Sequence, residues 1–241
     1  MTVLLMDVGA TSIKWTYADS EWERTRRRAT PRPLFPEMLV AFVAHRVRLR
    51  NCQAVGVAFP GAVADGVIVD AANVTRPLGP GTAPSPELSR AWTQCDLAAL
   101  LRRELSIPVV ILNDAFAVAR SSDVTDGRHL FVVLGTGCGV GLRDGGETVA
   151  IRDFGDDWWR GMTLDEAVGE RAREVDEERW RRSLIDVIHY LTEELAPDVV
   201  HLAGGNARRL RPTDIVGSVP VVIDRDVSAV RGVYRYLTES S

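Results

Sequence analysis

Three glycine-rich turns each follow a short apolar run of this sequence. They are Asp7-Val8-Gly9-Ala10-Thr11-Ser12, Gly135-Thr136-Gly137-Cys138-Gly139 and Gly204-Gly205-Asn206. Glycine lets the backbone approach an anion closely and direct successive N–H groups toward it, so such turns can hold phosphates. The Walker pattern G-x-x-x-x-G-K-[ST] does not occur in the sequence. The dinucleotide pattern G-x-G-x-x-G does not fit either, because the sequence predicts a strand rather than a helix after Gly137. Each turn alone is weak evidence, but the three together favour phosphate binding.

A carboxylate lies between the first two turns. Asn113 and Asp114 follow the apolar run 108–112, and ligands of open α/β sheets bind at this end of the strands. Asp114 could therefore act as a general base that takes a proton from a substrate hydroxyl. The pattern leaves a second role open, in which Asp114 caps the helix that follows it.

Alternating strands and helices must position these residues. In the first half, the sequence predicts strands over 3–6, 13–17, 22–28, 54–59 and 108–112, a helix that begins at Pro36 and another capped by Asp96. In the second half, it predicts strands over 130–134, 140–142, 198–202 and 219–223, a long helix from about Asp176 to Glu194, a short helix after Gly204 and a terminal helix. The stretch from Arg76 to Ser89 is rich in Pro, Gly and Ser and predicts a loop or lid. This order is typical of an α/β protein.

Composition excludes several classes of protein. The chain has 241 residues, 46% of them hydrophobic, which is enough for a substantial core and argues against disorder. The 29 Lys and Arg and the 33 Asp and Glu give a net charge of −4, which argues against nucleic-acid binding. The one basic cluster, Arg24 to Arg28, predicts an exposed strand face or edge.

Cysteine usage and hydropathy indicate a cytoplasmic protein. Cys52, Cys95 and Cys138 are odd in number and far apart, so neither a disulfide scaffold nor a zinc knuckle is expected. No apolar stretch approaches the roughly 18 residues of a membrane span, and no signal peptide is recognisable, so no membrane association is expected.

The whole chain resembles the actin-like ATPase and sugar kinase superfamily, and within it the ROK family near the zinc-less polyphosphate glucokinases. The motifs that carry the resemblance are Asp7 to Lys14 (DVGATSIK) against DIGGTxIK, Gly56 to Gly61 with Asn73 against the sugar-cleft segment, Asn113-Asp114-Ala115 against N-D-A, Leu134 to Gly139 against LGTGxG, and Leu202 to Ala207 against LGGGNA.

The resemblance implies an α/β fold of two lobes, the actin-like ATPase (ribonuclease H-like) fold, with a cleft between them. The first lobe would span residues 1–113 with a returning helix over 226–241, and the second would span 114–225. Phosphoryl transfer to a hydroxyl is implied, with Asp114 as the catalytic base and Asp7 holding Mg²⁺ through water. Phosphates would be held by Asp7, Gly9, Ala10, Thr11, Lys14, Gly135, Thr136, Gly137, Cys138, Gly204, Gly205 and Asn206. The acceptor would be held by Pro60, Gly61, Asn73, Asn113 and Asp114.

The sequence departs from the family pattern where a carboxylate and an imidazole of an E-x-G-H segment bind sugar hydroxyls. Here the segment reads Asp153-Phe154-Gly155-Asp156, and Asp156 cannot donate a hydrogen bond as histidine can. A further family glutamate falls at Asp165 or Glu166, of which Glu166 is included in the predicted site. The cysteine-rich zinc motif of many ROK proteins is missing, so no zinc is expected. Trp158 and Trp159 could wall a ring or form a buried pair.

These departures favour an ATP-dependent kinase whose acceptor is an altered sugar or a sugar-like cyclitol. A polyphosphate/ATP glucokinase is the first alternative, although the acidic balance and the lack of an evident lysine cluster favour ATP as the donor. A non-catalytic sugar- or nucleotide-binding regulator is the second, and the retained Asp114 argues against it. The apolar stripe of the helix from Asp176 leaves a homodimer open.

Overall fold

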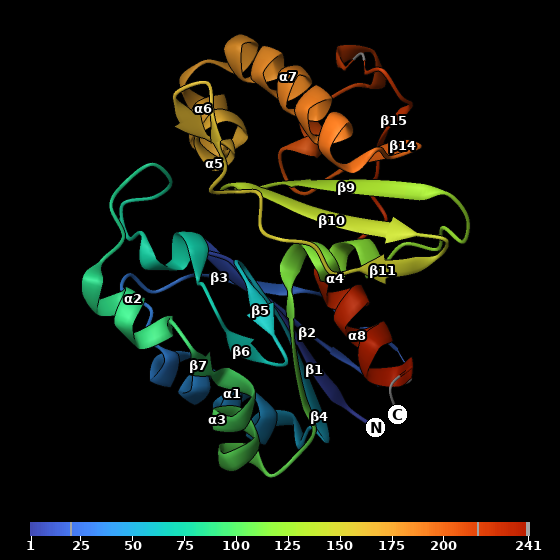
Figure 1. Cartoon of the computed structure of the whole chain (residues 1–241). Helices are drawn as coiled ribbons and strands as arrows, with labels where there is room; N and C mark the ends of the chain where they lie inside the picture. The colour runs from blue at the N-terminus through green and yellow to red at the C-terminus, as the bar shows by residue number, and fades with distance from the viewer. Residues whose placement is uncertain (20, 216, 240–241) are drawn as a thin grey trace.

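Two five-stranded sheets organise the chain (Figure 1). The computed structural model describes residues 1–19, 21–215 and 217–239. The first sheet has the order β3-β2-β1-β4-β8 and comprises β1 (Val3–Val8), β2 (Ser12–Ala18), β3 (Arg26–Ala29), β4 (Ala54–Phe59) and β8 (Val109–Asn113). The second has the order β11-β10-β9-β14-β15 and comprises β9 (Arg128–Leu134), β10 (Cys138–Asp144), β11 (Glu147–Val149), β14 (Val199–Ala203) and β15 (Val221–Ile223).

The two sheets share one topology. Each begins with three antiparallel strands and continues with two strands that run parallel to its first one. The hairpin turn between the first two strands is 9–11 in one sheet and 135–137 in the other. The first two glycine-rich turns therefore occupy equivalent places in the two sheets. The arginine-rich strand lies at a sheet edge and is exposed, as predicted, but it begins at Arg26 rather than at Trp22.

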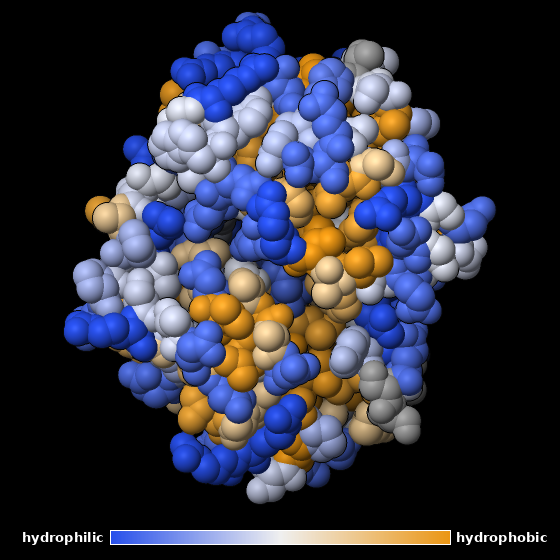
Figure 2. Space-filling view, in the orientation of Figure 1, coloured by the Kyte–Doolittle hydropathy of each residue, from blue (hydrophilic) through white to orange (hydrophobic). Residues whose placement is uncertain are grey.

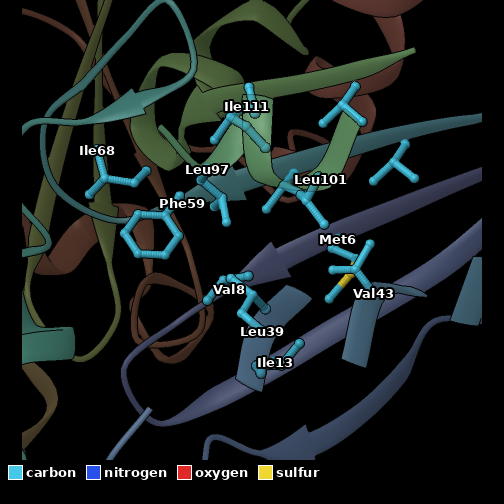
Figure 3. Packing of buried hydrophobic residues seen from close by; sticks show 14 of the residues in the cluster. Met6, Val8, Ile13, Leu39, Val43, Phe59, Ile68, Leu97, Leu101 and Ile111 are labelled. Atoms are coloured by element: carbon cyan, nitrogen blue, oxygen red, sulfur yellow. The ribbon is translucent and has the colours of Figure 1, made fainter. Parts of the chain in front are cut away.

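Two helices, α1 (Pro36–Arg50) and α3 (Leu97–Leu105), cover one face of the first sheet. Their apolar side chains, such as Leu39 and Leu101, pack on strand residues such as Met6 (Figure 3). The predicted N-cap Asp96 is confirmed, since its Oδ1 accepts a hydrogen bond of 2.8 Å from the Ala99 N–H. Sequence reasoning missed a small sheet of β5 (Val63–Ala64), β6 (Val67–Ile68) and β7 (Cys95–Asp96), whose strands are too short for a periodicity to register.

The predicted loop over 76–89 is wrong at its end. Helix α2 (Pro86–Trp92) begins inside it, and the Ser85 hydroxyl caps that helix by accepting a hydrogen bond from the Leu88 N–H. Serine followed by proline marks a helix start as well as a loop, so composition alone misassigned these residues. The loop itself spans 76–85, after the short 3₁₀ helix η1 (Ala72–Thr75).

Helix α7 (Glu177–Leu195) covers the outer face of the second sheet. Its apolar stripe, from Trp180 to Leu191, is buried in the chain's own core against residues such as Leu130. The stripe is therefore not available as a dimer surface. Short elements complete this half: β12 (Trp158–Trp159), β13 (Met162–Thr163), α5 (Leu164–Val168), α6 (Glu170–Val175), η2 (Ala207–Arg209) and η3 (Pro212–Asp214).

Helices α4 (Asp114–Arg120) and α8 (Ala229–Glu239) lie between the two sheets (Figure 1). A third apolar cluster joins Leu5, Phe131 and Val233 here, from the first sheet, the second sheet and α8. The predicted terminal helix is real but begins at Ala229, and residues 240 and 241 of that prediction lie outside the described residues. No helix in the described ranges is long and apolar enough to cross a membrane.

Gly232 sets the distance between α4 and α8, because a Cβ atom there would overlap the backbone carbonyl of Ala117. We expect Gly232→Ala to lower the free energy of unfolding by about 1–3 kcal/mol, since the added methyl group overpacks the contact and forces the helices apart. Urea denaturation followed by circular dichroism measures this. Gly205→Ala is the matched control, because nothing lies within 4 Å of a Cβ at that position. Equal stability of the two variants would contradict the tight crossing.

Candidate active site

The first two glycine-rich turns meet between the sheets. The side-chain oxygens of Thr11 and Thr136 lie 3.1 Å apart, although 125 residues separate them in the chain. The first turn is held from behind by Thr30, whose hydroxyl donates to the Gly9 carbonyl at 2.6 Å and whose N–H donates to the Thr11 carbonyl at 3.1 Å. The structure thus brings two predicted phosphate-binding turns together. A hollow whose lining includes Ala10 and Thr30 opens beside the first turn.

The third turn supports the second. Gly204 has a φ of +92°, and a Cβ there would overlap the Leu134 carbonyl, so only glycine fits. The next residues place Asn206 on the second turn, where its Nδ2 donates to the Gly135 carbonyl at 3.0 Å. Its Oδ1 accepts from Arg173 Nε at 3.0 Å. The buried Asn206 amide is therefore used within the protein, and the predicted phosphate contact would fall to the backbone of the turn.

Asn113, and not Asp114, caps α4. The Asn113 Oδ1 accepts a hydrogen bond of 2.8 Å from the Phe116 N–H, and its Nδ2 donates to the Gly61 carbonyl at 2.8 Å. The interpretation of Asp114 as the cap is wrong. The capping amide also ties α4 to the turn after β4, which contains Pro60 and Gly61.

The Asp114 side chain uses only one of its two carboxylate oxygens for hydrogen bonds to described residues. Its Oδ1 accepts from the Ala115 N–H at 2.7 Å, and no hydrogen bond among the described residues uses its Oδ2. Strand β10 passes close by, since a Cβ on Gly139 would lie 3.9 Å from Asp114 Oδ1. One carboxylate oxygen thus remains available beside the second glycine-rich turn.

Burial and neighbouring carboxylates raise the pKa of Asp114 to about 8. Desolvation is the largest cause, the charge of Asp7 is next, and Asp153 and Asp165 add to it, while the Ala115 N–H opposes the shift. Asp7 itself is paired with Lys14, whose ammonium lies 2.8 Å from its Oδ2. A carboxyl group with a pKa near neutrality is suited to proton transfer.

Asp165 joins the two halves of the site. Its Oδ1 accepts from the Cys138 N–H at 2.6 Å, and its Oδ2 accepts from Asn73 Nδ2 at 2.5 Å. The side chain is 7% exposed, and burial raises its pKa to about 6 although both hydrogen bonds oppose the shift. Glycines at 137 and 155 are required around it, because a Cβ at either would overlap the carboxylate.

Glu166, the residue included in the prediction, has a different partner. Its Oε2 accepts from the Thr163 N–H at 2.8 Å and from the Thr163 hydroxyl at 3.0 Å, so it completes a capping box at the start of α5. Of the two residues that the sequence left open for the family glutamate, Asp165 contacts Asn73 and Cys138, and Glu166 does not. The T-x-x-E spacing of Thr163 and Glu166 is a capping-box signature that could have separated the two.

The segment with Asp153 and Asp156 lies at the same site. Asp153 accepts from the Gly155 N–H at 2.9 Å, and burial with the charges of nearby aspartates raises its pKa. Asp156 pairs with Arg76, a residue that sequence reasoning missed because 80 positions separate them. Trp158 is 75% exposed, so the two tryptophans are not a buried pair.

Hydrophobic residues gather across the middle of the face shown in Figure 2, and hydrophilic ones cover its two ends.

Among the described residues, no group of three or more His, Cys, Asp and Glu could hold a metal ion by itself. Mg²⁺ at phosphate sites is commonly held by one or two carboxylates together with the phosphates. Asp7 fits that role, because its carboxylate repels the negative charge of Asp114 and a bound cation would reduce this repulsion.

Comparison with known proteins agrees with this arrangement. A sequence model of the ROK family matches residues 3–150. The polyphosphate glucokinase of Mycobacterium leprae is 25% identical over 223 residues, which cover 85% of this chain. The match spans 63% of the length of that relative, less than two thirds of it.

Two solved structures share the fold. The inorganic polyphosphate/ATP-glucomannokinase of Arthrobacter sp. strain KM superposes with a TM-score of 0.81 at 24% identity, over 100% of this chain and 99% of that one. A ROK family glucokinase from Streptomyces griseus, in complex with glucose and AMPPNP, gives a TM-score of 0.70 at 17% identity over 97% of both chains. The predicted α/β, actin-like ATPase fold is confirmed.

We expect Asp7→Asn to lower the pKa of Asp114 from its value of about 8, because a charge that opposes ionisation of Asp114 is removed. A carbon-13 NMR titration of the aspartate carboxyls measures this pKa. The control is Asp144→Asn, which breaks an ion pair with Arg128 and removes a carboxylate that is not among those raising the Asp114 pKa. An unchanged Asp114 pKa in the Asp7 variant would contradict the coupling.

Proposed function

The chain belongs to the ROK family, and we propose that it is an ATP-dependent kinase that phosphorylates a hydroxyl of a sugar or a sugar-like cyclitol. The observation that carries this proposal is Asp114, whose pKa of about 8 and unoccupied Oδ2 suit a general base beside two facing phosphate-binding turns. The named activities of the relatives agree with it, since they are glucokinases and a glucomannokinase.

The transfer needs positioning more than covalent chemistry by the protein. The acceptor hydroxyl gives its proton to the Asp114 carboxylate as its oxygen forms a bond to the γ-phosphorus. The bond between that phosphorus and the β–γ bridging oxygen breaks, and ADP leaves. The Gly9 and Gly135 N–H groups already donate within their own turns. The backbone N–H groups that would stabilise the phosphate charge are those of the other turn residues, Ala10, Thr11, Thr136 and Gly137.

Asp7 is the residue that would hold Mg²⁺, through water, next to the donor phosphates. When bound, the ion neutralises phosphate charge. Lys14, which is 45% exposed and paired with Asp7, would add a second positive charge beside the donor phosphates. The carboxylates of Asp153, Asp156 and Asp165, with Asn73, form the proposed acceptor site, and their acceptor-rich chemistry suits a polyol that donates several hydroxyl hydrogens.

Polyphosphate is a second candidate donor. The exposed edge strand Arg26–Ala29 runs beside the first turn, with Ala29 opposite Ser12, and its arginines would favour an extended polyanion. The names of the M. leprae and Arthrobacter relatives point the same way.

A non-catalytic regulator is disfavoured by the retained base. We place the protein in the cytoplasm, where its three free cysteines would stay reduced.

A screen of donors against acceptors tests the proposal. ATP, GTP and polyphosphate are each combined with hexoses, N-acetyl hexosamines and cyclitols, and phosphorylated product is detected by mass spectrometry. We expect product with ATP and a polyol, and a loss of at least roughly 100-fold in Asp114→Asn, because general bases contribute about 10²–10⁴-fold. Turnover that persists in the Asp114 variant, or none with any pair of substrates, would sink the proposal.

The pH dependence of kcat/KM tests the role of Asp114 separately. A base acts as the carboxylate, so kcat/KM should rise with pH and level off above the free-enzyme pKa of about 8. Asp153→Asn should move this limb to lower pH, because the Asp153 charge helps raise that pKa. A flat profile between pH 6 and 9 would contradict this assignment.

A further inference from the structure

Arg76 reaches from the first half of the chain onto the proposed acceptor site. Its Nη2 lies 3.3 Å from Oδ1 and 3.4 Å from Oδ2 of Asp156. Its Nη1 donates to the Thr82 carbonyl at 2.5 Å, so the guanidinium also fixes the loop in which it lies. The Arg76 side chain is 21% exposed, and that of Asp156 is 51% exposed. The Asp156 carboxylate is thus accessible to a ligand, and the Arg76 guanidinium is held in place by the Thr82 carbonyl.

The backbone around Arg76 is held at the same site. Arg76 follows η1 directly, and its N–H donates to the Asn73 carbonyl at 3.2 Å. Asn73 in turn donates to Asp165. The same loop packs against α5, because a Cβ on Gly81 would overlap the Glu166 carboxylate. The guanidinium therefore has little freedom to move away from Asp156, and it lines the hollow that also contains Ala10 and Asn73.

The chemistry of the pair explains why it could replace a histidine. A neutral imidazole offers one hydrogen-bond donor and one acceptor, whereas Asp156 can only accept and Arg76 can only donate. The two side chains together present both functions side by side at the proposed acceptor site. Two adjacent hydroxyls of a polyol can satisfy them at once, one donating to Asp156 and the other accepting from Arg76.

We propose that Arg76 is a specificity-determining residue that binds an acceptor hydroxyl oxygen next to the one that donates to Asp156. This inference rests on the proposed function, because it assigns the acceptor of that reaction. It also names the acceptor class as a neutral polyol with two adjacent hydroxyls away from the reacting one. An analogue that lacks either hydroxyl loses one charge-assisted hydrogen bond to the pair and binds more weakly.

The test compares Arg76→Met with the wild type on the best acceptor of the screen and on its monodeoxy analogues. We expect the acceptor KM to rise roughly tenfold or more, with kcat and the ATP KM within about twofold, because only acceptor binding loses a charge-assisted hydrogen bond. The wild type should discriminate against one deoxy analogue by a similar factor, and Arg76→Met should lose that discrimination. Arg76→Lys should recover part of it.

A matched control separates this role from simple stabilisation. Arg160→Met removes the ion pair with Asp186, which lies outside the proposed site, and should leave the acceptor KM and the deoxy discrimination unchanged. The charge swap Arg76→Asp with Asp156→Arg preserves an ion pair but exchanges donor and acceptor. If the swap restores the wild-type acceptor KM, Arg76 only holds the loop and the inference is wrong. Equal acceptor KM values for Arg76→Met and the wild type would also overturn it.

Equilibrium binding keeps the two proposals apart. Acceptor affinity is measured calorimetrically in the Asp114→Asn background, where turnover is absent, with and without Arg76→Met. If the wild type binds a polyol but phosphorylates none, the proposed function fails, and a roughly tenfold weaker Kd on loss of Arg76 still supports the inference. An unchanged Kd overturns it. If the wild type binds no polyol of the panel, both proposals are wrong.

Discussion

A buried carboxylate between the two halves of the chain constrains the site more than any other group. Asp165 is 7% exposed and needs hydrogen-bond donors on both oxygens, because an unpaired buried charge is costly. The donors are the backbone of the second glycine-rich turn and the amide of Asn73, which belongs to the opposite half. Satisfying this carboxylate therefore fixes the distance between the turn and η1, and with it the width of the proposed acceptor site.

The repeated sheet topology explains why the first two glycine-rich turns face each other. Each sheet places a glycine-rich hairpin turn between its first two strands, and the helices α4 and α8 between the sheets set how closely the two turns approach. Gly232 permits the close crossing of these helices. A site that depends on two turns from separate sheets is thus positioned by the apolar packing of α4 and α8 between the sheets.

Electrostatics gives the site its chemistry. The charges of Asp7, Asp153 and Asp165 raise the pKa of Asp114, and the charge of Asp153 also raises that of Asp165. Lys14 pairs with Asp7, and Arg76 pairs with Asp156. The pKa of Asp114 therefore lies close to neutral pH, so its carboxyl group can exchange a proton. The negative charge of the other carboxylates can be compensated by a cation that arrives with the phosphoryl donor. Arg76, which is paired with Asp156, places hydrogen-bond donors beside a carboxylate that can only accept.

The sequence by itself determined the strands of the two large sheets apart from β11, the three turns, the N-D-A motif and the family, because each depends on residues close together in the chain. Only the tertiary structure decided which side chain each functional group contacts. Asn113 rather than Asp114 caps α4, and Asp165 rather than Glu166 faces Asn73. The Arg76–Asp156 pair joins residues 80 positions apart. Local spacing specifies turns and helix starts, but neighbouring carboxylates on one short helix differ only by the direction in which the fold turns them.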